Sequence, residues 1–240
     1  MNLLNIKKEF PIFNNKNLVY LDSANSSQKP QSVINRINDF YSNEFSNVGR
    51  SVHYLAVAAT NLYENTRISV QKYINAKDKN EIVFTKGATE AINLVANTFG
   101  QKYLKAGDEV LTTTQDYGRM IATFKQRECR DGIVMKQFKI PIPAENENEI
   151  VRLFEKNITP KTKMILMCHM INITGQILPV KKVVRMAKKY NIPVIVDGAH
   201  TFAHFDFNLD DLECDYYATS LHKWLSAPFG TGMLLSLIHI

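Results

Sequence analysis

Two short segments in the last quarter of the sequence place reactive side chains directly after apolar runs. Asp197 ends the run 193–196, and His200 follows it three residues later. A second apolar run ends at Thr219 and is followed by Ser220, His222 and Lys223. A carboxylate and imidazoles can hold and move protons. A lysine amine that is kept deprotonated by burial can attack a carbonyl carbon.

A glycine turn earlier in the chain offers a place for an anion. Gly87-Ala88-Thr89-Glu90 follows the apolar segment 81–84 and leads into a helical pattern of apolar residues. The start of a helix presents free backbone N–H groups and the positive end of the helix dipole, both of which favour anions. Thr89 and Ser220 can add hydroxyl donors, and Asn172 follows a further apolar run near Cys168.

An anion cradle, a buried carboxylate and a lysine together satisfy the requirements of pyridoxal phosphate chemistry. The cradle would take the phosphate, and Asp197 would keep the pyridine nitrogen protonated so that the ring can accept electrons. Lys223 stands beside His222, Trp224 and Leu225, where desolvation can lower its pKa enough for it to bond to the cofactor aldehyde. The residues therefore predict pyridoxal 5'-phosphate as cofactor.

Strands that alternate with helices would bring these segments together. Apolar runs and helical spacing predict an α/β fold with a mainly parallel sheet covered by helices on both faces. In such sheets ligands bind beyond the carboxyl ends of the strands, where the reactive residues stand. The expected strands are 81–84, 109–113, 133–140, 163–168, 193–197, 215–219 and 232–235, and the expected helices are 88–99, 117–130, 147–156 and 180–190.

Several of these segments resemble one known family. Asp197-Gly198-Ala199-His200 and Ser220-Leu221-His222-Lys223-Trp224-Leu225 resemble the cofactor motifs of class V aminotransferase-fold enzymes, which depend on pyridoxal phosphate and include cysteine desulfurases. The N-terminal half is most similar to the SufS-type cysteine desulfurase and selenocysteine lyase branch. That similarity rests on the segments Tyr20-Leu21-Asp22-Ser23-Ala24, Gln28-Lys29-Pro30, Asn47-Val48 and 81–95.

The resemblance implies a fold, an assembly and a role for each site residue. It implies a fold type I large domain, followed by a small C-terminal domain, in a homodimer with active sites at its interface. Lys223 would be the Schiff-base lysine and Asp197 the partner of the pyridine nitrogen. The remaining cofactor contacts would be Ala88, Thr89, Ser220 and His222 around the phosphate, Asn172 near the substrate and the ring hydroxyl, and His200 where many relatives carry Gln.

The sequence departs from the desulfurase pattern after residue 113. SufS-type enzymes carry a histidine there that stacks on the cofactor ring, whereas this chain has Asp116 and Tyr117. Tyr117 can stack, but a phenol is a different acid–base group from an imidazole. From here on the chain is more similar to isopenicillin N epimerase-like proteins, notably at 126–134 and 222–232. The chain is thus either an intermediate subfamily or a mosaic of two genes joined near Gly107-Asp108-Glu109-Val110.

These likenesses lead to a domain organisation and to three candidate functions. We expect an N-terminal segment 1–20, a cofactor-binding domain 21–234 and a tail 235–240 that resembles a sequencing artefact, with the small domain missing. A cysteine desulfurase or selenocysteine lyase-like activity is expected first, with an amino-acid substrate and a sulfur-acceptor protein as partner. The alternatives are an epimerase or lyase of the same family, and an inactive fragment that at most binds cofactor.

Composition excludes several other classes of protein. The chain carries 29 Lys and Arg against 23 Asp and Glu, without the basic, aromatic-rich stripe of a nucleic-acid protein. No apolar run is long enough to span a membrane, and no secretory signal is visible. Three separate cysteines fit the reducing cytoplasm. No metal is expected, because His200 and His204 are spaced for a helix but lie in a predicted loop.

Overall fold

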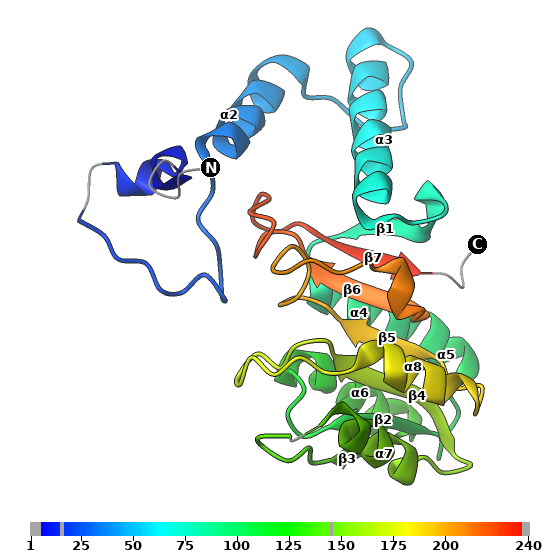
Figure 1. Ribbon diagram of the computed structural model, residues 1–240. Coiled ribbons are helices and arrows are strands. Elements are labelled where there is room, and N and C mark those ends of the chain that lie inside the picture. The colour runs from blue at the N-terminus through cyan, green and yellow to red at the C-terminus, as the bar shows by residue number, and fades with distance from the viewer. Residues whose placement is uncertain (1–5, 15–16, 145, 237–240) are drawn as a thin grey trace.

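A seven-stranded sheet lies at the centre of the protein (Figure 1). The computed structural model describes residues 6–14, 17–144 and 146–236, and every statement below concerns these residues. In space the strand order is β1-β7-β6-β5-β4-β2-β3. The strands are β1 (Ile82–Thr85), β2 (Glu109–Thr113), β3 (Val134–Phe138), β4 (Thr162–Cys168), β5 (Val194–Asp197), β6 (Tyr216–Ser220) and β7 (Gly232–Ser236).

The sheet is parallel except at β7, which confirms the predicted α/β class. The strands β3, β2, β4, β5 and β6 pair in parallel, and β7 runs antiparallel to both β6 and β1. Gly232 at the start of β7 pairs with Thr85 on one side and with Ser220 on the other. The carboxyl ends of β1 and β6 therefore flank a single glycine, which places the turn after β1 next to the loop after β6.

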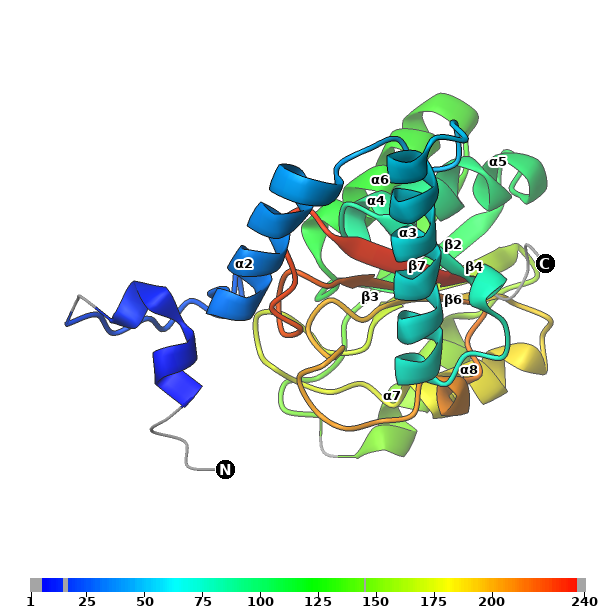
Figure 2. The same cartoon turned by 90° about the horizontal axis from the view of Figure 1, so that it is seen from above.

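Helices cover both faces of the sheet (Figure 2). On one face α4 and α6 pack on a core that includes Ile92 and Phe124, and on the other α7 and α8 pack on a core that includes Phe154 and Val183. The helices are α2 (Gln31–Asp39), α3 (Tyr54–Ile74), α4 (Ala88–Asn97), α5 (Phe99–Tyr103), α6 (Gly118–Asp131), α7 (Glu147–Asn157) and α8 (Val180–Lys188). Short 3-10 turns lie at Lys7–Glu9, Pro11–Phe13, Lys79–Glu81 and Asp210–Leu212, and a π turn at Phe40–Glu44.

The apolar strands alternate between the two cores. In β4, Ile165 belongs to the core under α7 and α8, and Leu166 belongs to the core under α4 and α6. In β5, Val194 and Ile195 divide in the same way. A strand that is buried on both faces needs apolar residues at every position. This requirement explains why these strands appear in the sequence as continuous apolar runs.

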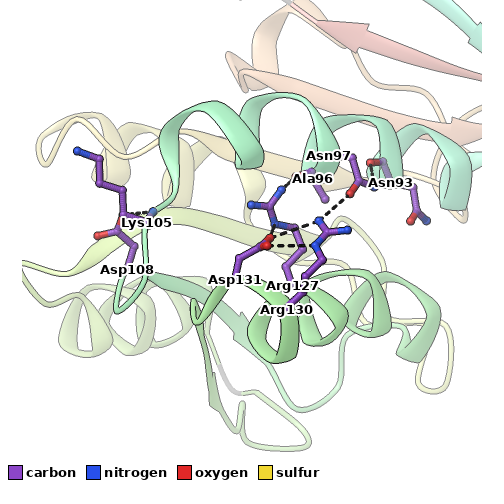
Figure 3. Close-up of polar contacts among 8 residues, drawn as sticks. All are labelled: Asn93, Ala96, Asn97, Lys105, Asp108, Arg127, Arg130 and Asp131. Atoms are coloured by element: carbon purple, nitrogen blue, oxygen red, sulfur yellow. Dashed lines mark hydrogen bonds and ion pairs between the residues drawn. The ribbon is translucent and has the colours of Figure 1, made fainter.

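A buried arginine fastens the C-terminal end of α4 to α6 (Figure 3). Arg127 Nη1 donates a hydrogen bond to the carbonyl oxygen of Ala96 at 2.7 Å, and Arg127 Nε lies 2.9 Å from an oxygen of Asp131. Arg130, which is exposed, also pairs with Asp131 at 3.0 Å. The last turn of α4 leaves backbone carbonyls without helical partners, and the Arg127 guanidinium satisfies one of them. Arg127 therefore holds the C-terminal end of α4 in place, while Ala88 lies at the N-terminal end of the same helix.

The residues before α3 extend away from the sheet (Figures 1 and 2). We call residues 17–52 the N-terminal arm. No residue of α2, which belongs to the arm, is buried in the described structure, and the arm exposes apolar side chains such as Leu21 and Val52. The predicted boundary at residue 20 falls inside this extended region. Leu235 and Ser236 of the predicted tail belong to β7, and 237–240 lie outside the described residues.

None of the helices in the described part of the chain combines the length and the apolarity that a membrane crossing requires.

Candidate functional site

One cavity of about 640 Å³ opens at the carboxyl edge of the sheet. This volume falls within the range of small-molecule and cofactor sites. The cavity brings together all nine residues proposed from the sequence, which come from five different connections. They are Ala88, Thr89, Tyr117, Asn172, Asp197, His200, Ser220, His222 and Lys223. Further lining residues that were given no cofactor role from the sequence are Asn25, Lys86, Asn93, Cys168, Met170 and Ala199.

The first turn of α4 and the end of β6 form an anion cradle. The Ser220 hydroxyl accepts a hydrogen bond from the backbone N–H of Ala88 at 3.0 Å. A Cβ atom at Gly87 would lie 3.2 Å from Ser220 Oγ and 3.4 Å from His222 Cε1, so glycine keeps this space open. The free N–H groups and the dipole of α4 then face a polar recess. This recess suits a phosphate group.

His222 adds an imidazole to the cradle. Its Nδ1 lies 3.0 Å from the carbonyl oxygen of Thr231, which leaves Nε2 for a ligand in the cavity. Burial lowers the pKa of His222, and the charges of Lys29 and Lys223 lower it further. A bound phosphate would oppose this effect, because its negative charge stabilises the protonated ring.

Asp197 and Lys223 stand at the ends of neighbouring strands. Asp197 is buried, and its Oδ1 accepts a hydrogen bond from Ala199 N at 2.9 Å. Burial raises the pKa of Asp197 to about 6, although Ala199 N–H and the Lys223 charge oppose the shift. Burial also lowers the pKa of Lys223, against the attraction of Asp197. Such a lysine has a larger fraction of neutral, nucleophilic amine at neutral pH than an exposed one.

His200 lies against this lysine. Its Nε2 is 3.1 Å from Lys223 Nζ. Burial, followed by the charges of Lys223 and His204, lowers the pKa of His200 to about 4. The imidazole is therefore neutral at physiological pH and can exchange a hydrogen bond with the amine.

The structure distinguishes Tyr117 from Asp116. The Asp116 carboxylate is buried and accepts hydrogen bonds from Thr112 Oγ1 and Thr113 N, both at 2.7 Å, and from Cys168 N at 2.7 Å. It ties the end of β2 to the end of β4 and does not line the cavity. Tyr117 lines the cavity and is 42% exposed. Tyr117 is thus the residue of the pair that is free to contact a ring.

His204 and Cys168 are two further residues near the cavity whose side chains could bind a metal or act as a nucleophile. The His204 ring stacks on Trp224 with ring centroids 3.7 Å apart, so this histidine packs against an aromatic side chain. Among the described residues, no group of three His, Cys, Asp or Glu is arranged to hold a metal ion. Cys168 lines the cavity, but burial and the charge of Asp116 raise the pKa of its thiol well above the ordinary value. It is a buried thiol and not an activated nucleophile.

Comparison with known families decides the assignment of the chain. The family model "Aminotransferase class-V" matches residues 19–236. The chain belongs to the class-V aminotransferase family. The match spans the cradle, both strand ends at the cavity and the segment 20–30, so every element of the site lies within this class-V domain.

Curated relatives of this class-V domain are described as cysteine desulfurases. A "Probable cysteine desulfurase" of Halalkalibacterium halodurans is 38% identical over 239 residues, which are 98% of this chain and 58% of that protein. A protein of the same description from Synechocystis is 36% identical over 95% of this chain and 54% of its own length. The chain therefore spans somewhat more than half the length of these relatives.

Solved structures give the same picture of this class-V fold. A cysteine desulfurase from Escherichia coli superposes with a TM-score of 0.85 at 30% identity, over 98% of this chain and 58% of that one. The apo cysteine desulfurase of Thermococcus onnurineus gives a TM-score of 0.85 and 30% identity, over 98% and 56% of the two chains.

The cavity of the class-V domain fits pyridoxal 5'-phosphate, the cofactor of this family. A recess that a single Cβ would narrow, lined by the first turn of α4, suits the phosphate. The buried carboxylate of Asp197 suits a protonated ring nitrogen, which would return its raised pKa toward the ordinary range. A desolvated lysine amine completes the set of groups.

Proposed function

We propose that this chain carries the cofactor-binding part of a pyridoxal-phosphate enzyme that acts on cysteine, in the manner of a cysteine desulfurase or selenocysteine lyase. The single observation that carries the proposal is the convergence of Lys223, Asp197 and the first turn of α4 on one cavity. The family of the chain and the descriptions of its relatives support it.

The residues divide the work by their chemistry. Lys223 presents an amine whose lowered pKa keeps part of it neutral, so it can bond to the aldehyde of the cofactor. The neutral imidazole of His200, 3.1 Å away, orients this amine and accepts or donates a proton at Nζ. Asp197 holds a proton on the ring nitrogen. When bound, the cofactor supplies an electron sink for electrons released at the substrate Cα.

The other lining residues fix the position of the cofactor. The first turn of α4 at Ala88 and Thr89, the Ser220 hydroxyl that the Ala88 N–H orients, and His222 would hold the phosphate. Tyr117 and Asn172 also line the cavity; Tyr117 would cover a face of the ring, and Asn172 would contact the substrate and the ring hydroxyl. A phosphate held at one end and a ring nitrogen held at the other would fix the position of the ring in the cavity.

The wider parts of the proposal follow the relatives. The substrate is an amino acid, cysteine first, and the sulfur leaves to an acceptor protein. The enzyme is a homodimer of the cytoplasm, in keeping with three free cysteines. Tyr117, in place of the imidazole expected of a desulfurase, favours the second candidate, an amino-acid epimerase of the same family.

Cofactor attachment is the first test. After incubation with pyridoxal 5'-phosphate and removal of the free cofactor by gel filtration, the chain should retain a visible absorbance band, and borohydride reduction followed by peptide mapping should place a pyridoxyl group on Lys223. Lys223→Ala should abolish both signals, and Asp197→Asn should weaken binding. Asp215→Asn is the control, because Asp215 is a partly buried carboxylate that accepts a hydrogen bond from Val194 N at the opposite end of β5 from Asp197. Absence of a band in the unchanged chain would overturn the proposal.

Substrate turnover is the second test. Formation of alanine from cysteine, with sulfide released by an added thiol reductant, supports the desulfurase. Exchange of the Cα proton with solvent, with racemisation and no loss of sulfur, supports the epimerase instead.

A further inference from the structure

The N-terminal arm contacts the body of the protein at the loop that carries Lys223. Ser27 Oγ donates a hydrogen bond to the carbonyl oxygen of Lys223 itself. Lys29 Nζ donates to the carbonyl oxygen of the preceding residue, His222, at 2.6 Å. Ser226 Oγ lies 3.2 Å from Ser27 Oγ and closes the contact from the other side. Two side chains nearly two hundred residues away thus bind two successive carbonyl groups at the lysine.

The arm is shaped locally to make this contact. Tyr20 donates its hydroxyl proton to the carbonyl oxygen of Ser26 at 2.5 Å. The backbone of Asp22 accepts hydrogen bonds from the N–H groups of Asn25 and Ser26, and the Asp22 carboxylate accepts from Asn25 Nδ2 at 2.7 Å. This compact turn places Asn25 in the cavity lining and carries Ser27 and Lys29 onto the loop.

The loop needs such support because it has no regular structure of its own. Residues 221–231 lie between β6 and β7 without helix or strand. Within the loop, the Lys223 carbonyl accepts a hydrogen bond from Ser226 N at 3.0 Å, and Leu221 N bonds to Thr231 O at 2.9 Å. Ala227 N also bonds to Leu221 O at 3.1 Å, so the loop is held by scattered bonds rather than by the regular ladder of a helix or strand, and contacts from other segments restrict it further. Fixing the carbonyls of His222 and Lys223 restricts the direction in which the Lys223 side chain leaves the backbone.

We infer that Ser27 and Lys29 are positioning residues for Lys223, and that docking of the arm and occupancy of the cavity by an anionic pyridoxal ligand stabilise each other. The inference rests on the proposed function for the identity of the ligand. A ligand that bonds to Lys223 favours the loop conformation in which the arm is docked. Coupling of this kind is reciprocal, so the docked arm must also favour the ligand.

The charge of Lys29 acts in the same direction. Lys29 is half-buried against the loop, and burial lowers its pKa. Its ammonium group is close enough to His222, a cavity residue, to lower the pKa of that imidazole. A cation at this place attracts an anionic ligand toward the cradle. The titratable groups that face the Lys29 ammonium are those of His222 and Lys223.

The experiment compares the unchanged chain with Ser27→Ala, Lys29→Met and the double variant. Gln31→Ala is the control, because Gln31 bonds to Asn35 within the exposed face of α2. Trypsin cleavage after Arg36 and Arg50 measures docking of the arm, with and without pyridoxal 5'-phosphate. We expect the ligand to slow cleavage about fivefold in the unchanged and control chains, the population change that one or two hydrogen bonds produce. The double variant should lose this protection. Lys29→Arg, which keeps a cationic donor, should retain more of the protection than Lys29→Met does.

A second measurement needs no cofactor. The rate at which an amine-selective acylating reagent modifies Lys223 is followed against pH. In the double variant the midpoint of this profile should move upward, toward that of an ordinary lysine, because the loosened loop exposes the amine to water. An unchanged midpoint together with unchanged protection would overturn the inference. Failure of the unchanged chain to take up cofactor would count against the proposed function, and the pH profile alone would then decide the role of Ser27 and Lys29.

Discussion

Lys223 Nζ lies 3.1 Å from His200 Nε2, although the two residues follow different strands. The parallel register of β5 and β6, in which Asp197 pairs with Ala218, places the two strand ends side by side. The loops that leave these ends then carry an amine and a neutral imidazole into contact inside the cavity. Through this contact, His200 can form a hydrogen bond directly with the amine of Lys223.

The contact predicts different outcomes for two substitutions of His200. His200→Gln keeps a polar group that can bond to the amine, so affinity for pyridoxal 5'-phosphate should change little. His200→Leu removes the partner, and affinity should fall about fivefold, as expected for one hydrogen bond to a buried amine. Absorbance titration measures both. Equal affinities for the Gln and Leu variants would show that the imidazole does not orient Lys223.

Gly87 should be intolerant of a side chain. In Gly87→Ala the new methyl group would lie 3.2 Å from Ser220 Oγ and would narrow the phosphate recess. Affinity for pyridoxal 5'-phosphate should fall about tenfold, in line with the cost of mild overpacking. Gly118→Ala at the start of α6 is the control, since a methyl group added there would meet no heavy atom within 4 Å. Isothermal titration calorimetry measures both, and a similar loss in the two variants would contradict the steric explanation.

Arg127 should stabilise the fold much more than Arg130. Both pair with Asp131, but Arg127 is 2% exposed and also binds the end of α4 (Figure 3). Arg127→Met should lower the free energy of unfolding by about 2 kcal/mol, because the buried carbonyl oxygen of Ala96 loses its hydrogen-bond donor. Arg130→Met should cost less than about 1 kcal/mol. Urea denaturation of the two variants gives the comparison, and equal losses would refute it.

His169 should make the protein sensitive to mild acid. It is buried among Phe205, Phe207 and Tyr217, and burial lowers its pKa from 6.5 to about 4. Between these two values the unfolded chain binds more protons than the folded chain. The stabilisation is therefore fully present above pH 6.5 and is lost as pH falls toward 4. From pH 7 to pH 5 this group should cost about 2 kcal/mol of unfolding free energy.

The variant His169→Phe isolates this effect. A phenyl ring keeps the aromatic packing and removes the titration. The raised pKa of Asp197 acts in the opposite direction, since its contribution is lost as pH rises through about 6, and His200 acts in the same direction as His169. Both groups are common to the two chains, so the difference between the urea curves at pH 7 and pH 5 reports His169. Identical pH dependence in the two chains would contradict the prediction.

Much of the sheet was predictable from the residues. The expected strand 109–113 coincides with β2, and the other expected strands and helices lie within a few residues of their observed ends. Central parallel strands are buried on both faces, so an apolar run such as 194–196 has few alternative structures. The helices α2 and α3 were not predicted; no residue of α2 and only Ala56, Ala59 and Ile74 of α3 are buried, so these segments show no continuous apolar run like those of the central strands. Leu21, for example, is 91% exposed.

The residue types and their order along the chain establish which chemistry is available to this protein. A lysine, a carboxylate, a glycine turn before a helix and their order along the chain are local features, and local features are written in residue types. The tertiary structure alone decided which groups meet. Because β2 and β4 are neighbours, the Asp116 carboxylate accepts hydrogen bonds from the ends of both strands. Tyr117, the next residue, lines the cavity instead. Ser27 reaches the Lys223 carbonyl because the start of the arm lies next to the loop between β6 and β7. Distances between remote segments depend on strand order and register, and no local pattern encodes them.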